Sequence, residues 1–141
     1  MEAEELANEL TRLRKQVRII AMLDTLEYLK KGGRISKTVA FAGELLSIKP
    51  VITIEDGEIK ILGKANNLLV REIEQSGGVY FSRPVLLGYT GLSDMLLRKY
   101  IADSAHLWQE APDALRVCCI GSVIGTHAGP GAVAAAYFCK G

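Results

Sequence analysis

The sequence predicts an α/β fold with α+β character, in which helices cover a mixed sheet of about five to six strands in a two-layer domain. Three observations lead to this prediction. Apolar residues recur at helical spacing in some segments and at alternate positions in others, and the two kinds of segment follow one another along the chain. Asp56-Gly57 separates two alternating runs, which is typical of an antiparallel hairpin. The 141 residues, 49% of them hydrophobic, suffice for a sizeable core.

The chain is expected to open with a helix over residues 2–16. Its leucines fall three to four residues apart, at Leu6, Leu10 and Leu13. A β-type apolar run follows over 17–23. Asp24 then has the character of a helix N-cap, and a short helix is expected over 25–31, where a pair of glycines ends it.

The middle of the chain contains the predicted hairpin. A helix is expected over 38–46, and alternating β-branched residues predict strands over 48–54 and 58–62. Leucine and isoleucine on one side of the next segment predict a helix over 65–75.

The last third of the chain continues the alternation. A short apolar run predicts a strand over 85–89, and helical spacing predicts a helix over 91–105. The expected buried stripe of this helix is Leu92, Met95, Leu96 and Tyr100. Strands are expected over 115–120 and 132–139, joined by a glycine-rich loop over 121–131.

Charge and cysteine content narrow the function classes. Lys and Arg number 17 and Asp and Glu 16, so the basic excess of a nucleic-acid-binding protein is missing. The sequence has no run of about 18 apolar residues that would predict a membrane span, and its acidic N-terminus lacks the pattern of a secretion signal. The cysteines have no metal-ligand spacing, and we expect buried, reduced thiols in a cytoplasmic protein. They are Cys118, Cys119 and Cys139.

One segment with chemical potential surrounds the glycine pair Gly32-Gly33. Four positive charges flank it, at Lys30, Lys31, Arg34 and Lys37. Glycine N–H groups can face an anion, and the planar guanidinium of Arg34 suits a carboxylate or a phosphate. A helix C-terminus with basic residues that complement the helix dipole explains the same residues without a ligand.

A second segment spans residues 120–132 and contains four glycines between Gly121 and Gly131. His127 and Thr126 can donate hydrogen bonds to a carboxylate, and the glycines permit a close approach. A Gly/Pro turn with a solvated histidine is the alternative. The segment lacks the Gly-Lys-Ser/Thr of a phosphate-binding loop, and a following strand excludes a dinucleotide fingerprint.

Other chemistry finds less support. A serine nucleophile served by His127 would need an orienting carboxylate and an oxyanion hole, and no Gly-x-Ser-x-Gly elbow is present. His106 is expected to be structural, and Tyr100 and Trp108 are expected in the core or an interface.

Three segments resemble markers of the DegV family. The run from Leu23 to Ser36, which ends in Gly-Gly-Arg-Ile-Ser, resembles the opening of that family's second domain. Ser47-Ile48-Lys49-Pro50-Val51 resembles the next marker, and Ile-Gly-Ser-Val-Ile-Gly-Thr-His-Ala-Gly-Pro-Gly-Ala over 120–132 resembles the C-terminal signature. Their order over residues 17–139 makes the resemblance specific.

The resemblance implies a bacterial carrier that binds a long-chain fatty acid between two domains, with no cofactor and no enzymatic activity of its own. It implies a partner, a fatty acid kinase, which converts the presented carboxylate to an acyl-phosphate for phospholipid synthesis. By position, His127 matches the histidine near the carboxylate. The stretch that shapes the head-group end contains Gly125, Thr126, Gly129 and Gly131. Arg34 and Gly33 match a motif linked to kinase docking or head-group handling.

The resemblance also predicts a domain organisation. Residues 1–16 correspond to a helix leading in from a missing N-terminal domain, and residues 17–141 to the C-terminal lipid-binding domain. Without the partner domain an apolar face should be exposed, so a homodimer is expected. Two alternatives stay open: an enzyme, either a phosphotransferase-related domain or a hydrolase, and a structural or interaction module without a ligand.

Overall fold

Six strands form one mixed sheet in the order β3-β2-β1-β6-β4-β5 in the computed structural model, which describes residues 1–35, 49–64, 67–109 and 115–140. In chain order they are β1 (Val17–Met22), β2 (Pro50–Glu55), β3 (Glu58–Lys64), β4 (Leu86–Tyr89), β5 (Val117–Cys119) and β6 (Val133–Phe138). Neighbouring strands are antiparallel, except that β4 and β5 are parallel. The predicted mixed sheet is confirmed.

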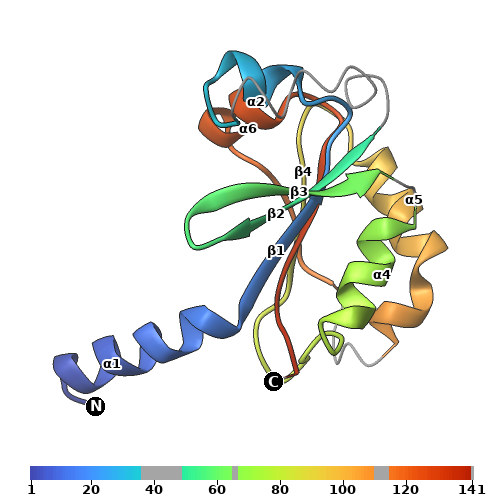
Figure 1. The fold of residues 1–141 in the computed structure, drawn as a ribbon. Coiled ribbons are helices and arrows are strands. Elements are labelled where there is room, and N and C mark those ends of the chain that lie inside the picture. The colour runs from blue at the N-terminus through green and yellow to red at the C-terminus, as the bar shows by residue number, and fades with distance from the viewer. Residues whose placement is uncertain (36–48, 65–66, 110–114, 141) are drawn as a thin grey trace.

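Apart from the first, the helices lie on one face of the sheet and at one end of it. They are α1 (Ala3–Leu13) with the 3-10 turn η1 (Arg14–Gln16), α2 (Glu27–Lys31), α4 (Leu68–Gln75), α5 (Met95–Asp103) with the 3-10 turn η2 (Ala105–Trp108), and α6 (Ser122–Ala128). Figure 1 shows α4 and α5 beside the sheet, α2 and α6 together above one end, and α1 projecting away. No helix among the described residues has the length and apolar character needed to span a membrane. The expected helix over 38–46 lies outside the described residues.

The β2–β3 hairpin follows from its turn residues. Asp56 and Gly57 have φ values of 52° and 79°, as a type I′ turn requires. The turn sets Glu55 opposite Glu58, and a register shift between Val51 and Ile52 bends the hairpin near its far end. The predicted hairpin is confirmed.

One sheet face and helices α4 and α5 form the main core. Alternate residues of the central strands point into it, as on a half-covered sheet. The buried residues there include Ile20, Leu69, Ile73, Leu87, Leu97, Tyr100, Val133, Ala135 and Tyr137. The predicted stripe of α5 is wrong for Leu92, Met95 and Leu96, which are exposed. The helix begins only at Met95, and its buried residues are Leu97 and Tyr100.

The expected loop over 121–131 is also wrong, because residues 122–128 form helix α6. Gly121 precedes the helix in an extended conformation, and Gly129, with φ of 76°, ends it. Packing of α6 against α2 compensates for the weak helix propensity of its glycine. The N-cap residue of α2 is Leu26 rather than the expected Asp24, and the Oγ1 of Thr25, just before it, accepts a hydrogen bond from the Glu27 amide at 3.2 Å.

The cysteines differ from the expectation of buried thiols. Cys118 and Cys139 are partly buried, but Cys119 is exposed on edge strand β5. All three are free thiols.

Candidate functional site

The sheet face opposite α4 and α5 has a pocket of about 470 Å³, a size typical of small-molecule sites. Small residues from three central strands form its floor: Ala21, Gly88, Ala134 and Ala136. Larger apolar side chains line its sides: Ile19, Ile54, Leu86 and Ile120. The floor is low because these four residues have almost no side-chain volume, whereas their neighbours on the opposite face include Ile20, Val133 and Tyr137.

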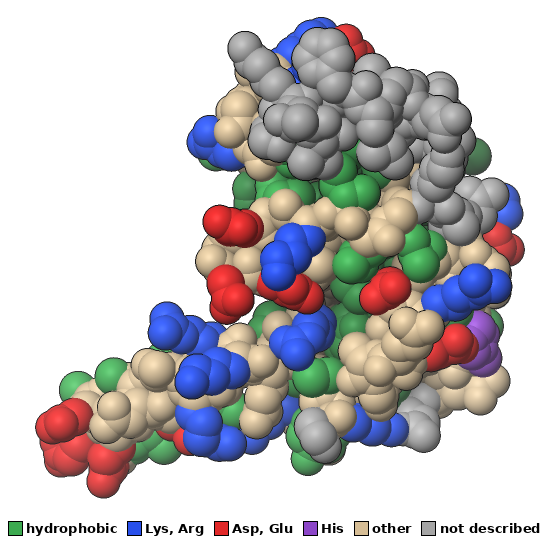
Figure 2. Space-filling view, viewed as in Figure 1, with side chains coloured by type: hydrophobic (Ala, Val, Ile, Leu, Met, Phe, Trp, Pro, Cys, Tyr) green, Lys and Arg blue, Asp and Glu red, His purple; other side chains and the backbone are tan. Residues whose placement is uncertain are grey.

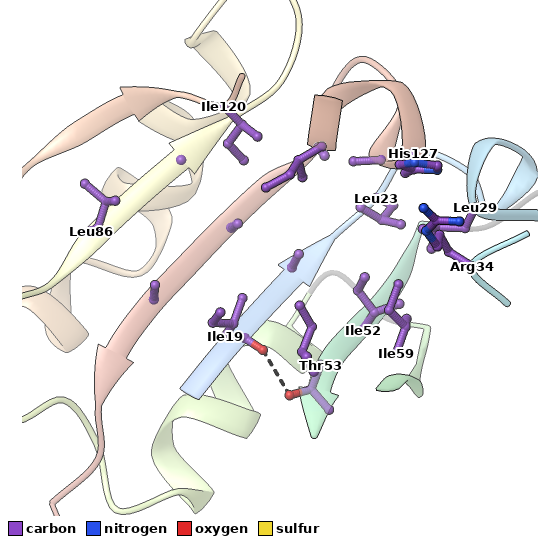
Figure 3. Close-up of a pocket in the computed structure, with 18 of the residues that line it drawn as sticks. Ile19, Leu23, Leu29, Arg34, Ile52, Thr53, Ile59, Leu86, Ile120 and His127 are labelled. Carbon is purple, nitrogen blue, oxygen red and sulfur yellow. Dashed lines mark hydrogen bonds between the residues drawn. The ribbon is translucent and has the colours of Figure 1, made fainter. Parts of the chain in front are cut away.

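The pocket is elongated along β6. Its lining includes Ala132, Ala134 and Ala136. The four residue steps of extended chain from Ala132 to Ala136 span about 13 Å. Leu86 is paired with Ala136 at the end of this row. Figure 3 shows Leu86 on the sheet, away from the end that contains His127. The space therefore suits a long, narrow apolar molecule.

Polar side chains gather at one end of the pocket, where α2 and α6 meet. Arg34 and His127 are the lining residues among the described part of the chain with side-chain N–H groups, and Figure 3 shows them close to Leu29 at this end. Thr53 also lines the pocket, but its hydroxyl donates to the Ile19 carbonyl oxygen at 2.9 Å. Donors that a ligand can use are therefore concentrated at one end of an otherwise apolar space.

The two donors are held differently. His127 lies in the last turn of α6, and its Nδ1 is buried without a hydrogen-bond partner among the described residues. Arg34 follows the end of α2, and its Nη1 donates to the Gly32 carbonyl oxygen at 3.1 Å. The guanidinium of Arg34 retains its other N–H groups for an anion.

The other predicted site residues lie around the pocket rather than along it. The Thr126 hydroxyl donates to the Ser122 carbonyl oxygen at 2.7 Å, and Thr126 is exposed outside the lining. Gly125 is inside α6, while Gly129 and Gly131 form the turn into β6 with positive φ. Gly33, with φ of 67°, turns the chain from α2 towards Arg34. The structure thus brings His127 and Arg34 together at the pocket and places the glycines in its supporting backbone.

Thr90 is a supporting residue that sequence analysis missed. Thr90 is buried, and its Oγ1 donates to the Gly129 carbonyl oxygen at 2.5 Å. The Oγ1 of Thr90 also accepts a hydrogen bond from the Ala132 amide at 2.9 Å. It therefore ties the end of β4 to the turn that follows α6. A lone threonine after a strand gives no signal of this role. The alternating alanines of β6, in contrast, are visible in the sequence as small residues on one face.

The side chains at the polar end of the pocket can bind an anionic group. No group of three or more His, Cys, Asp or Glu side chains suited to a metal ion occurs within the described ranges. A guanidinium and an imidazole at the end of an apolar trough suit an elongated molecule with one anionic end.

The chain is similar in sequence and fold to known proteins. A DegV domain-containing protein of Caldanaerobacter subterraneus is 31% identical, over 92% of this chain and 47% of its own length. The crystal structure of a fatty acid binding DegV family protein from Streptococcus agalactiae matches with a TM-score of 0.75 and 27% identity, over 100% of this chain and 51% of that one. The fatty acid kinase B3 protein of Streptococcus pneumoniae, loaded with linoleic acid, matches with a TM-score of 0.79 and 19% identity, over 99% of this chain and 50% of that one.

The chain thus spans about half the length of these proteins. The sequence profile of the family described as "Uncharacterised protein, DegV family" matches residues 1–140. With this match and the shared fold, the chain belongs to the DegV family.

Proposed function

We propose that the chain binds a long-chain fatty acid, with the acyl tail on the floor of small residues and the carboxylate at His127 and Arg34. The observation that supports this is the concentration of N–H donors at one end of an apolar pocket. Burial of ten methylenes would contribute about 8 kcal/mol before the entropic costs of binding. A carboxylate leaving water needs hydrogen-bond donors, which the guanidinium and the imidazole supply.

Relatives support the same ligand class. The protein from Streptococcus agalactiae is described as fatty acid binding, and the one from Streptococcus pneumoniae contains linoleic acid. The tail's shape and length would depend on the far end of the pocket, near Leu86.

The proposal includes a second protein surface that would cover the pocket. On the pocket side of the sheet, the lining residues Leu86 and Ile54 remain exposed, and the relatives are about twice as long as this chain. In a full-length member, the other half would form the N-terminal domain that covers this side. Residues 1–16 would then lead in from that domain and residues 17–141 would be the C-terminal lipid-binding domain.

The role that follows is that of a carrier. The site offers binding groups, and the neighbour from Streptococcus pneumoniae is described as a fatty acid kinase B protein. The partner would be a fatty acid kinase that receives the carboxylate for phospholipid synthesis, in the cytoplasm, where free thiols such as Cys119 persist. Arg34, exposed beside the carboxylate end, would contact either the head group or the kinase.

Ligands that differ only at the head group test the site. The delipidated chain would be titrated with palmitic acid and with hexadecanol, which share a tail but differ in charge. His127→Ala should weaken palmitic acid binding about tenfold or more, because charge-assisted hydrogen bonds contribute roughly 1.5–3 kcal/mol. Binding of hexadecanol should change little.

His106→Ala is the matched control. This second histidine is exposed and contacts Glu74 at 2.9 Å, outside the pocket lining. It should bind palmitic acid like the wild type. Failure of the wild type to bind either ligand, or equal losses for both ligands in His127→Ala, would contradict the proposal.

A further inference from the structure

Gly32 lacks a side chain for reasons of space rather than backbone conformation. Its φ and ψ are −79° and −1°, which any residue adopts. A Cβ added there would lie 2.7 Å from Cε1 of His127 and closer still to Nδ1. The adjacent Gly33 shows the opposite case, with φ of 67° and no described atom within 4 Å of an added Cβ. The imidazole of His127 therefore sits directly on the bare backbone of Gly32.

This contact determines which imidazole nitrogen can donate a hydrogen bond to a ligand. Nδ1 is buried without a hydrogen-bond partner. The amides of Gly32, Gly33 and Arg34 already donate to carbonyl oxygens within α2, so none is left to donate to it. A proton on Nδ1 would be a buried donor without an acceptor, which folded proteins tolerate less often than an unpaired buried acceptor. The neutral ring thus carries its proton on Nε2, the nitrogen left to reach the pocket.

A second contact of the same kind runs in the opposite direction. A Cβ added at Gly129 would lie 2.7 Å from Cε2 of Tyr28 and closer to another ring carbon. Tyr28 and Gly32 are four residues apart in and after α2, and His127 and Gly129 are two residues apart at the end of α6. Each segment thus places an aromatic ring on a glycine of the other. The pair of contacts fixes how α2 and α6 sit relative to one another.

We propose that Gly32 is a positioning residue for His127: its missing side chain forms a seat that buries Nδ1, orients the ring and presents Nε2–H to an anionic ligand. The Tyr28–Gly129 contact holds that seat in place. The role of Nε2 as carboxylate donor rests on the proposed fatty acid binding, whereas the seat itself is a property of the free protein.

Gly32→Ala tests the seat. The added methyl should displace the ring, so that the imidazole ¹⁵N signals of His127 in the NMR spectrum lose the Nε2–H pattern expected for the wild type. Affinity for palmitic acid should fall about tenfold, with hexadecanol binding nearly unchanged. Gly121→Ser is the control, because Gly121 precedes α6 with φ of −61° and open space at its Cβ, and serine is favoured there. It should retain wild-type signals and affinity.

A double-variant cycle keeps the test valid if Gly32→Ala folds poorly. Its thermal midpoint should fall below that of the wild type. In a His127→Ala background the same change should lower the midpoint much less, because only the Tyr28 carbonyl oxygen, at 3.1 Å, remains close to the added Cβ. Equal effects of Gly32→Ala on the thermal midpoint in both backgrounds, or unchanged His127 signals, would contradict the positioning role of Gly32. If no variant binds palmitic acid while the cycle and the signals behave as expected, the proposed function fails and the seat stands.

Discussion

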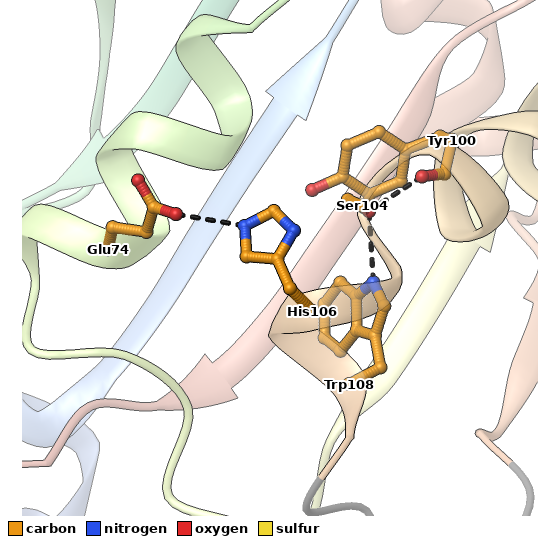
Figure 4. A network of polar contacts seen from close by, with 5 residues as sticks. All are labelled: Glu74, Tyr100, Ser104, His106 and Trp108. Carbon is orange, nitrogen blue, oxygen red and sulfur yellow. Dashed lines mark hydrogen bonds and ion pairs between the residues drawn. The ribbon is translucent and has the colours of Figure 1, made fainter.

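The hydroxyl of Ser104 joins α5 to η2 and leaves a neighbouring phenol without a partner. It donates to the Tyr100 carbonyl oxygen at 2.6 Å and accepts from Nε1 of Trp108 at 3.0 Å (Figure 4). The ring of Tyr100 packs edge-on against Trp108, and its own hydroxyl is buried without a hydrogen bond among the described residues. Burial raises the pKa of Tyr100, and the nearby Ser104 offsets only part of this rise.

Tyr100 should therefore make stability sensitive to alkaline pH. The unfolded phenol loses its proton near pH 10 (about its ordinary pKa), while the folded one keeps it, so stability should fall as pH rises above 10. Tyr100→Phe should cost little at pH 7, because no hydrogen bond is lost, and should reduce the decline above pH 10. Urea unfolding at pH 7 to 11 measures both effects. Tyr80→Phe, at an exposed tyrosine, is the control, and an unchanged slope in Tyr100→Phe would contradict this explanation.

The sequence indicates the two donor residues at the pocket, His127 and Arg34, because each lies beside glycines. Glycines mark sharp turns and close approaches, and these are properties of local sequence. Thr126 lies outside the lining because of its angular position on helix α6. The loop expected from the sequence does not define such a position. The contact between Gly32 and His127 joins segments about ninety-five positions apart, so no local pattern could predict it.

Elements with strong local signals were predicted well, and α6 was not. Asp56-Gly57 determines the hairpin through its turn geometry. In 121–131, by contrast, several glycines and a proline predict a loop. Contacts with α2 stabilise the helix there, and these arise only in the folded chain.

A glycine within α6 allows a test of the helix. No described atom lies within 4 Å of a Cβ added at Gly125, and alanine is favoured over glycine in a helix interior by about 1 kcal/mol. Gly125→Ala should therefore raise the free energy of unfolding by about that amount, measured by urea denaturation. Gly131→Ala should lower it, since its φ is 78° while its added Cβ would meet only ordinary contacts. A loss of stability in Gly125→Ala would argue against the helix.

At the scale of the whole molecule, the order of the strands determines the pocket. The central neighbours β1 and β6 lie at opposite ends of the chain, and their pairing aligns Ala21 with Ala134. This alignment joins the small residues of separate strands into one floor. The sequence predicts the strands but not their order, because pairing between distant segments has no local signal.

The described helices leave the two faces of the sheet unequal. Helices α4 and α5 bury one face, and on the other the pocket is flanked by apolar side chains that remain accessible. Leu86 and Ile54 are 43% and 46% exposed at its two sides, on β4 and β2. A second exposed apolar surface lies on the projecting α1, where Leu6 and Leu10 face solvent, and Figure 2 shows this arm with acidic side chains at its tip. Exposed apolar surface of this extent favours association.

We expect the isolated chain to form a homodimer through the open sheet face rather than through α1. A two-fold dimer would place two such faces against each other and remove Leu86 and Ile54 from water. In sedimentation velocity runs at increasing concentration, the wild type should shift towards the dimer, and Leu86→Lys should remain monomeric because the dimer would bury its charge. Leu10→Gln, on α1, should dimerise like the wild type. Monomeric behaviour of Leu10→Gln alone would assign the interface to the arm, and a wild type that stays monomeric throughout would show that the open face does not drive association.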